Sequence, residues 1–153
     1  MPEIDAEHPR PLCVVLDTNV YISGVILSRG TPFEILEAWR KQAYIPITSE
    51  AIIAEIERVL RYPRIRDRYH ITDADNMRLI ASLRTDALVV PDSNTANGIC
   101  SDPDDDKFLA CASTAQADYI VTGDPDLLIL GQYKETIILK PHEFLNQLEM
   151  GDK

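Results

Sequence analysis

The sequence predicts an α/β domain whose central, mainly parallel sheet is covered by helices on both faces. Three observations predict it. Short β-branched runs alternate along the chain with longer segments whose apolar residues recur at helical spacing. These short runs are apolar throughout, as expected of strands that are buried on both faces. At 153 residues and 45% hydrophobic content, the chain is also long enough for one sizeable core.

Local signals then predict each element in turn. The polar, proline-containing residues 1–10 predict a loose lead-in before a single domain at 11–150. Ser49 and Thr72 are residues that commonly cap the start of a helix, and Pro91 ends an apolar run. In chain order we expect a strand at 12–17, helices at 18–27 and 31–42, a strand at 43–49, helices at 50–62 and 72–86, a strand at 87–91, a helix at 104–117, strands at 118–124 and 135–141, and a helix at 141–149.

The charge balance argues against a general nucleic-acid binder. The formal net charge is −10, whereas such proteins gain affinity by neutralising phosphates with lysine and arginine. One segment differs: RVLRYPRIRDRYH, residues 58–70, carries five arginines and two tyrosines. This basic segment therefore needs a separate explanation.

The cysteines and the apolar runs indicate the cellular setting. Cys13, Cys100 and Cys111 lack the spacing of a zinc or redox site, so we expect reduced thiols. No apolar run approaches the roughly 20 residues that a membrane span needs, and no secretory signal opens the chain. We expect a soluble cytoplasmic protein that does not contact a membrane.

Acidic residues gather where ligands bind in open α/β sheets, beyond the carboxyl ends of the strands. Asp17 and Asp124 each end a predicted strand, and Glu55 lies beside the apolar face of a predicted helix. Four more aspartates precede an apolar helix in CSDPDDDKFLACA, at positions 102, 104, 105 and 106. Such carboxylates repel one another unless a cation lies between them.

Carboxylates without histidine or cysteine neighbours favour hard cations, Mg²⁺ or Mn²⁺, over zinc. The three histidines show no spacing typical of metal ligands. A hard cation among carboxylates suits phosphoester chemistry, so phosphodiester hydrolysis is the leading reaction class.

The alternative is that some of these acids have a purely structural role and only cap helices. Aspartates in a first turn complement the helix dipole, and Asp126 is a second candidate cap after Asp124. An EF-hand loop starting at Asp102 is excluded, because Lys107 stands at its glycine position and Ser113 at its last ligand position.

Four blocks together resemble the PIN-domain ribonuclease family, in particular its bacterial branch of toxin components of toxin–antitoxin pairs. They are VVLDTNVYISGVI, SEAIIAEIERVL, DPDDDKFLACA and DYIVTGDPDLL, and the match runs from about residue 12 to 148. The resemblance implies a PIN-like Rossmannoid α/β/α sandwich and a metal-dependent endoribonuclease that hydrolyses single-stranded RNA with one or two Mg²⁺ or Mn²⁺ ions. It also implies a small antitoxin partner and a homodimer, with 33–39 or the C-terminus as candidate interfaces.

Carried over by position, the resemblance assigns four catalytic acids. They are Asp17, Glu55, Asp106 and Asp124, with Asp17, Asp106 and Asp124 as metal ligands and Glu55 placing or deprotonating the attacking water. Asn19 and Thr122 match supporting positions. Asp102, Asp104 and Asp105 either support the metal shell or cap the helix, and Asp102 and Asp104 are the candidate metal ligands among them. Glu50 and Glu57 are near alternatives to Glu55.

Arg58, Arg61 and Arg64 are candidate RNA contacts, with neighbouring tyrosines stacking on bases. The alternative is a solvated face in which these arginines pair with acids such as Glu57. Two other functions stay open: a non-catalytic PIN-fold protein that binds RNA or a partner, or another Mg²⁺-dependent phosphohydrolase. Against the haloacid-dehalogenase type of phosphohydrolase, the first strand ends in Asp17-Thr18-Asn19 and lacks the second aspartate.

Overall fold

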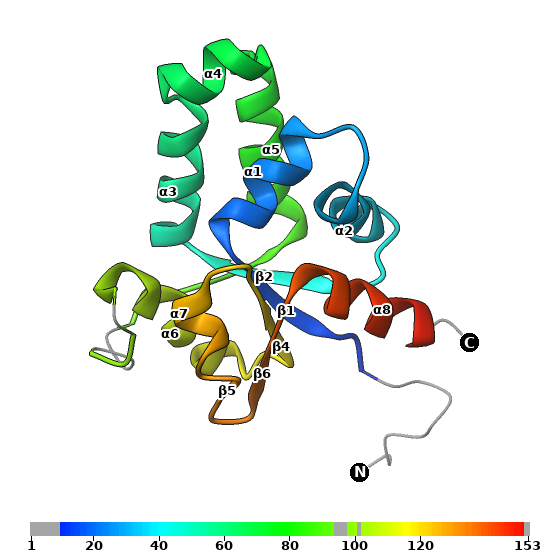
Figure 1. Ribbon diagram of the computed structural model, residues 1–153, viewed down its shortest axis with the longest axis vertical. Coiled ribbons are helices and arrows are strands. Elements are labelled where there is room, and N and C mark those ends of the chain that lie inside the picture. Colours follow the sequence, from blue (N-terminus) through cyan, green and yellow to red (C-terminus); the bar gives the residue numbers. More distant parts are fainter. Residues whose placement is uncertain (1–9, 94–97, 101, 152–153) are drawn as a thin grey trace.

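One sheet lies at the centre of the computed structural model, which describes residues 10–93, 98–100 and 102–151 (Figure 1). Its strands run in the order β3-β2-β1-β4-β6-β5. All neighbours are parallel except β5 and β6, which are antiparallel. The strands are β1 (Cys13–Leu16), β2 (Ile45–Ser49), β3 (Leu88–Val90), β4 (Tyr119–Val121), β5 (Gln132–Tyr133) and β6 (Thr136–Leu139). The predicted mainly parallel α/β fold is confirmed.

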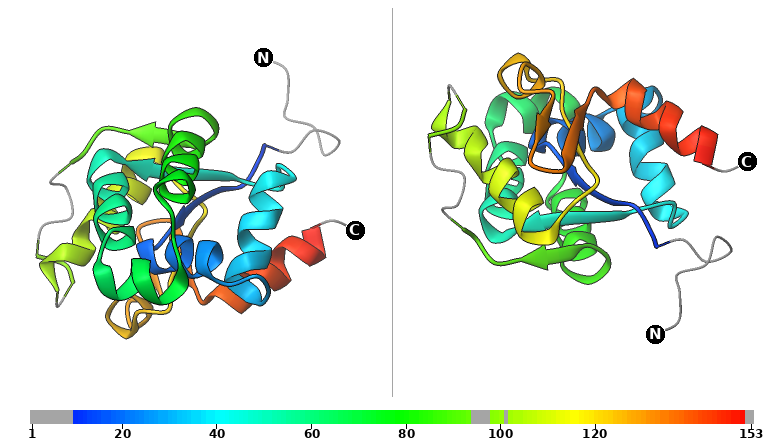
Figure 2. Two further views of the ribbon diagram at one scale, coloured as in Figure 1. Left: turned by 90° about the horizontal axis from the view of Figure 1, so that it is seen from above. Right: turned by 90° about the horizontal axis from the view of Figure 1, so that it is seen from below.

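Helices lie on both faces of this sheet (Figures 1 and 2). Helix α6 packs beneath β1, β2 and β4, while α1, α3 and α5 lie on the opposite face, with α4 bridging the far ends of α3 and α5. The helices are α1 (Thr18–Ile26), α2 (Thr31–Arg40), α3 (Glu50–Leu60), α4 (Pro63–Tyr69), α5 (Asp73–Asp86), α6 (Asp106–Ala115), α7 (Pro125–Leu128) and α8 (Pro141–Gly151), with a 3₁₀ turn η1 (Pro103–Asp105) before α6.

The predicted caps begin the helices as expected. The Ser49 hydroxyl accepts the Ile52 N–H (3.4 Å) at the start of α3. At α5, Thr72 Oγ1 accepts the Asp75 N–H and Asp75 Oδ2 accepts the Thr72 N–H, both at 3.0 Å, which makes a full capping box. Asp17 caps α1, where its side chain accepts the Asn19 N–H.

The structure adds elements that the apolar pattern did not predict. The basic segment folds into α4, and Pro63 is its first residue. Proline suits this position because N–H groups in the first turn of a helix have no partner within the helix, so the N–H that proline lacks is not needed. Helix α4 has no fully buried residue, so it carries little apolar signal. The helix expected at 104–117 begins at Asp106, after η1, and the short α7 and β5 follow β4.

Three further expectations concern the termini, the cysteines and the membrane. Apart from Arg10, which pairs with Asp118 (2.6 Å), the predicted lead-in at 1–10 lies outside the described residues, and the domain boundary stays a prediction. All three cysteines are free thiols, and Cys100 and Cys111 are buried. Within the part of the chain that the structure describes, no helix combines the length and apolar character of a membrane span.

Close packing of α1 on α2 depends on Gly24. A Cβ atom at Gly24 would lie 2.5 Å from Leu36 Cδ1 and 3.0 Å from the Pro32 carbonyl oxygen. The contact with Leu36 is too short for a real Cβ, and the backbone of Pro32 cannot move away cheaply. Gly24 therefore sets how closely the two helices approach.

We predict that Gly24→Ala destabilises the fold by about 1 kcal/mol or more. Overpacking costs ~1–3 kcal/mol, whereas alanine's better helix propensity returns only about 1 kcal/mol. Urea denaturation measures the change. Gly123→Ala is the matched control, because no atom lies within 4 Å of a Cβ there. A Gly24→Ala variant as stable as the starting protein would contradict this account of α1–α2 packing.

Candidate functional site

The carboxyl ends of β1 and β4 lie side by side and are joined by hydrogen bonds. The Asp17 N–H donates to the Val121 carbonyl (3.0 Å). The buried Thr122 hydroxyl donates to Asp17 Oδ2 (2.6 Å) and accepts the Asp124 N–H (3.0 Å). Thr122 therefore links the first and the fourth predicted acids.

Asp17 is held from two sides and is nearly inaccessible to solvent. Besides the Thr122 bond, its Oδ1 accepts the Asn19 N–H (3.0 Å), which caps α1. Burial, above all, raises the pKa of Asp17, and the negative charges of Asp124 and Glu55 add to the rise. The support expected from Asn19 comes through its backbone.

Three further carboxylates form a cluster beside this junction. Asp105, Asp124 and Asp126 each place an oxygen within 4.8 Å of the others. Asp105 ends η1, and Asp124 caps α7 by accepting the Asp126 N–H (2.9 Å). The cluster thus joins the start of α6 to the end of β4.

Asp105 has the most perturbed environment of these acids. Its Oδ2 atom is buried, and no donor contacts it among the described residues. Burial first, then a hydrogen bond shared with Asp124 and the charges of Asp124, Asp102 and Asp17, raise the pKa of Asp105 to about 7. A buried carboxylate oxygen without a donor is costly unless a proton or a cation occupies it.

This donor set fits a hard divalent cation. The cluster offers only carboxylate oxygens, and the described residues include no lysine or arginine ion-paired to Asp17, Asp105, Asp124 or Asp126. Oxygen ligands with uncompensated negative charge are what Mg²⁺ and Mn²⁺ prefer. The residues therefore fit the metal expected from the sequence, with Asp105 and Asp126 added to the ligand set.

Asp106, a predicted metal ligand, is held by backbone donors, and its role at a metal stays a prediction. Its Oδ1 accepts the Cys100 N–H and its Oδ2 accepts the Gly98 N–H, both at 2.8 Å. Burial raises the pKa of Asp106, but the hydrogen bonds from Cys100 and Gly98 outweigh burial and lower it overall. The structure uses this carboxylate to fasten a loop to α6, and Asp105 faces the other acids instead.

Asp102 and Asp104 also have local partners rather than a place in the cluster. Asp102 caps η1 by accepting the Asp104 N–H (3.0 Å). Asp104 Oδ2 lies 3.1 Å from Lys107 Nζ, and the hydrogen bond to Lys107 lowers the pKa of Asp104. For these two residues, which the sequence predicts to support a metal or to cap the helix, the geometry favours capping and ion pairing.

Glu55 projects from α3 toward the site, but both of its oxygens have partners. The Thr18 hydroxyl donates to Oε1, and Lys107 Nζ donates to Oε2 at 2.9 Å. Arg58 lies 3.9 Å from the same Oε2. Glu55 is therefore fixed beside Asp17, the neighbour of Thr18, with its charge compensated.

The three arginines expected to bind RNA are exposed near this helix. Arg58 hydrogen-bonds to Tyr62, and Arg61 lies 3.8 Å from Glu57, the pairing expected of a solvated face. Arg64 lies exposed on α4. Ala54, Glu57, Arg58, Arg61 and Tyr62 together line a shallow pocket on α3.

Sequence reasoning left the role of Asp105 open and did not assign Asp126 or Lys107 to the site. The signal for Asp105 was present in the DPDDD block, but choosing among its aspartates requires knowing where α6 begins. Asp126 looked like a cap for α7, a role that Asp124 takes. Lys107 was considered only as a mismatch to a calcium loop.

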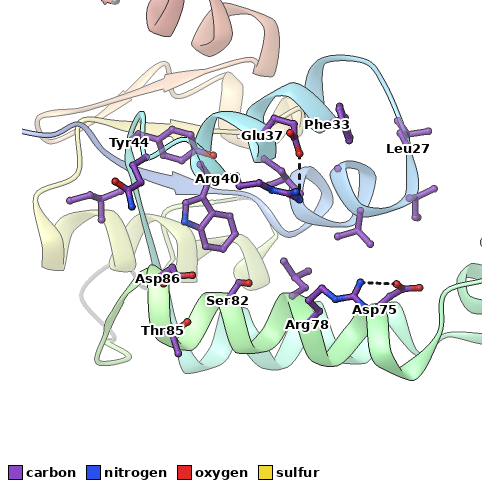
Figure 3. A pocket seen from close by; sticks show the side chains of 18 of the residues that line it. Leu27, Phe33, Glu37, Arg40, Tyr44, Asp75, Arg78, Ser82, Thr85 and Asp86 are labelled. Atoms are coloured by element: carbon purple, nitrogen blue, oxygen red, sulfur yellow. Dashed lines mark hydrogen bonds and ion pairs between the residues drawn. The ribbon is translucent and has the colours of Figure 1, made fainter.

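A cavity of about 990 Å³ lies apart from these acids, between α2 and α5 (Figure 3). Leu27, Phe33 and Trp39 line one side of it. Its polar rim includes two ion pairs, Arg40 with Glu37 and Arg78 with Asp75, each at 3.4 Å (Figure 3). None of the acids of the cluster lines it.

Comparisons with known proteins agree with this fold. The chain is 32% identical over 144 residues to the uncharacterized protein MJ1680 of the archaeon Methanocaldococcus jannaschii, covering 89% of this chain and 91% of the relative. Because this relative is archaeal, it does not confirm the bacterial branch expected from the motifs.

Two solved structures share the fold at 13% identity. One is VapBC2 from Rickettsia felis bound to a DNA fragment from their promoter, with a TM-score of 0.58 over 84% of this chain and 98% of that one. The other is Mycobacterium tuberculosis VapC20, a sarcin–ricin loop cleaving toxin, with a TM-score of 0.56 over 81% and 98%.

A family model decides the membership. The model for the PIN domain matches residues 13–126, which span β1 through the start of α7 and so contain every acid of the cluster. The chain therefore belongs to the PIN domain family.

Proposed function

We propose that the protein is a metal-dependent endoribonuclease that hydrolyses phosphodiester bonds of single-stranded RNA. The observation that carries the proposal is the uncompensated carboxylate cluster beside the ends of β1 and β4, with the buried Asp105 Oδ2 lacking a donor. The described residues of this site offer no thiol or hydroxyl nucleophile paired with a histidine, so hydrolysis by an activated water fits best.

The residues proposed to hold Mg²⁺ or Mn²⁺ are Asp17, Asp105, Asp124 and Asp126. When bound, such an ion neutralises phosphate charge and lowers the pKa of an attacking water. The contacts described above support proposing Asp105 in this set in place of Asp106. Asp102 and Asp104 are not included in this set, because each has a local partner.

The chain's own groups prepare this site. Thr122 and the Asn19 N–H hold the two oxygens of Asp17 in fixed directions. Asp105 keeps a proton near neutral pH, and it must lose that proton before it can act as a ligand. Glu55, fixed by Thr18 and Lys107, orients the water or phosphate on the α3 side of the cluster.

RNA is proposed to approach along α3. The overall charge of −10 repels a polyanion, so a local positive surface has to guide it. Arg58 and Arg61 leave 58% and 61% of their side chains exposed on this helix, and Arg64 follows on α4. Tyr62, between them, is exposed and can stack on a base.

A role as the toxin of a toxin–antitoxin pair is the finer part of the proposal. It rests on the shared fold with VapBC2 and VapC20, one a structure of a VapBC pair and the other described as a toxin. The predicted interface at 33–39 contributes Phe33 and Trp39 to the cavity between α2 and α5, which could seat an antitoxin segment. A homodimer and a cytoplasmic location complete the proposal.

Cleavage of a mixed single-stranded RNA pool tests the activity directly. With Mg²⁺ or Mn²⁺ we expect cleavage, with EDTA none, and with Asp17→Asn a loss of about 100-fold or more, because changing even an outer-shell partner of a metal typically costs 10–100-fold. Gel analysis of the fragments measures the rate. If Asp17→Asn cut as fast as the starting protein, the proposed site would be wrong.

Asp105 and Asp106 are expected to respond oppositely to replacement by asparagine. In EDTA at pH 8, above the pKa of Asp105, Asp105→Asn should raise the melting temperature, because it removes a repelled charge, and it should abolish the gain caused by Mg²⁺. Asp106→Asn should lower the melting temperature, because one of two charge-assisted hydrogen bonds, each worth ~1.5–3 kcal/mol, is lost. It should keep the Mg²⁺ gain. Thermal denaturation with and without Mg²⁺ separates the two, and loss of the gain only in Asp106→Asn would restore the original assignment.

The pKa of Asp105 predicts how cation binding depends on pH. Folding raises this pKa from its ordinary value near 3.8 to about 7, so the folded state binds the extra proton in this window and, without metal, stability falls as pH rises through it. Protons therefore compete with the cation below about pH 7. At a sub-saturating Mg²⁺ concentration, the gain in melting temperature should be larger at pH 8 than at pH 6, and Asp105→Asn should remove this difference.

A further inference from the structure

Lys107 brings a positive charge among the acids at the start of α6, besides fixing Glu55. Its ammonium group, on a side chain only 16% exposed, contacts three acceptors. These are Glu55 Oε2 at 2.9 Å, the Asp104 carbonyl oxygen at 2.8 Å and Asp104 Oδ2 at 3.1 Å. An ammonium group has three protons, so these contacts match its full donor capacity.

These contacts divide the acids near the site into two groups with different charge balance. Glu55 and Asp104 face Lys107, and Arg58 lies 3.9 Å from Glu55, so two negative charges meet two positive ones. Asp17, Asp105, Asp124 and Asp126 meet no lysine or arginine among the described residues. A divalent cation is attracted by the second group, whereas the first already has its cations.

Glu55 is also sterically committed. Thr18 donates to its Oε1 and Lys107 to its Oε2, so a second metal ion at Glu55 would either lie beside the Lys107 ammonium or displace one of these donors. Binding there would place two cations beside each other or deprive a largely buried ammonium of one of its two carboxylate partners, and both are costly. The geometry therefore resists a second ion at Glu55.

We propose that Lys107 takes the place of a second metal ion. On the proposed metal-dependent function, the protein binds one divalent cation at Asp17, Asp105, Asp124 and Asp126, and Lys107 acts as a positioning residue that compensates Glu55 and excludes a second ion from it. The segment that opens α6 thus supplies both an acid for the metal and a fixed positive charge.

Counting bound Mn²⁺ tests the proposal without measuring activity. The full chain is titrated with Mn²⁺, and free Mn²⁺ is followed by electron paramagnetic resonance. We expect one ion per chain for the starting protein and for Lys107→Arg, which keeps the positive charge. We expect two ions for Lys107→Met, since Glu55 and Asp104 then keep only the charge of Arg58, 3.9 Å from Glu55, and one again for Lys107→Met combined with Glu55→Gln.

The outcomes separate this inference from the proposed function. Two ions bound by the starting protein would overturn the role of Lys107 and leave the metal-dependent function standing, and this arm needs no variant to fold. One ion bound by a folded Lys107→Met, checked by circular dichroism, would overturn it as well. No saturable binding by the starting protein, together with no RNA cleavage, would overturn both proposals.

Discussion

The hydrogen bond from Thr122 to Asp17 (2.6 Å) is the contact on which the rest of the site depends. It joins the ends of β1 and β4, strands that lie far apart in the sequence but adjacent in the sheet. The same hydroxyl accepts the Asp124 N–H, so one small side chain fixes two acids that repel each other. The crossover from β3 through α6 to β4 then brings Asp105 to the same edge. Remote parts of the sequence meet here because the strand order requires it.

Three consecutive aspartates show how strongly local geometry decides the chemistry of one residue type. The pKa is lowered at Asp104 by Lys107, raised at Asp105 by burial and by Asp124, and lowered at Asp106 by backbone N–H groups that outweigh burial. Only Asp105 lacks favourable donors. A fold tolerates a destabilised buried carboxylate where a ligand compensates its charge. Acids with perturbed pKa values therefore gather at functional sites.

Much of the fold and part of the site could be predicted from the sequence. Strands buried on both faces are apolar throughout, and caps such as Ser49 and Thr72 mark helix starts, so the α/β order was readable. Asp17 and Asp124 could be placed near each other from the sequence because strand ends are readable too, and the structure links them through Thr122, a position that the family resemblance named. The exposed α4 was missed because a helix that buries no face leaves no apolar period. The role of Asp105 was left open because its direction depends on the 3₁₀ turn before α6, which no single residue specifies.

The start of α6 explains why a motif shared with the family cannot by itself assign a role to each of these acids. Successive residues of a helix point about 100° apart, so the three residues Asp105, Asp106 and Lys107 face three directions. They contact the acid cluster, the loop at Gly98 and Cys100, and Glu55. If the helix began one residue earlier or later, the residue that fastens the loop would take the place of the proposed metal ligand, or the proposed ligand would take the place of the lysine. At 13% identity to solved relatives, the topology is retained while this register is free to differ, so each chain's own contacts have to decide which aspartate serves the metal.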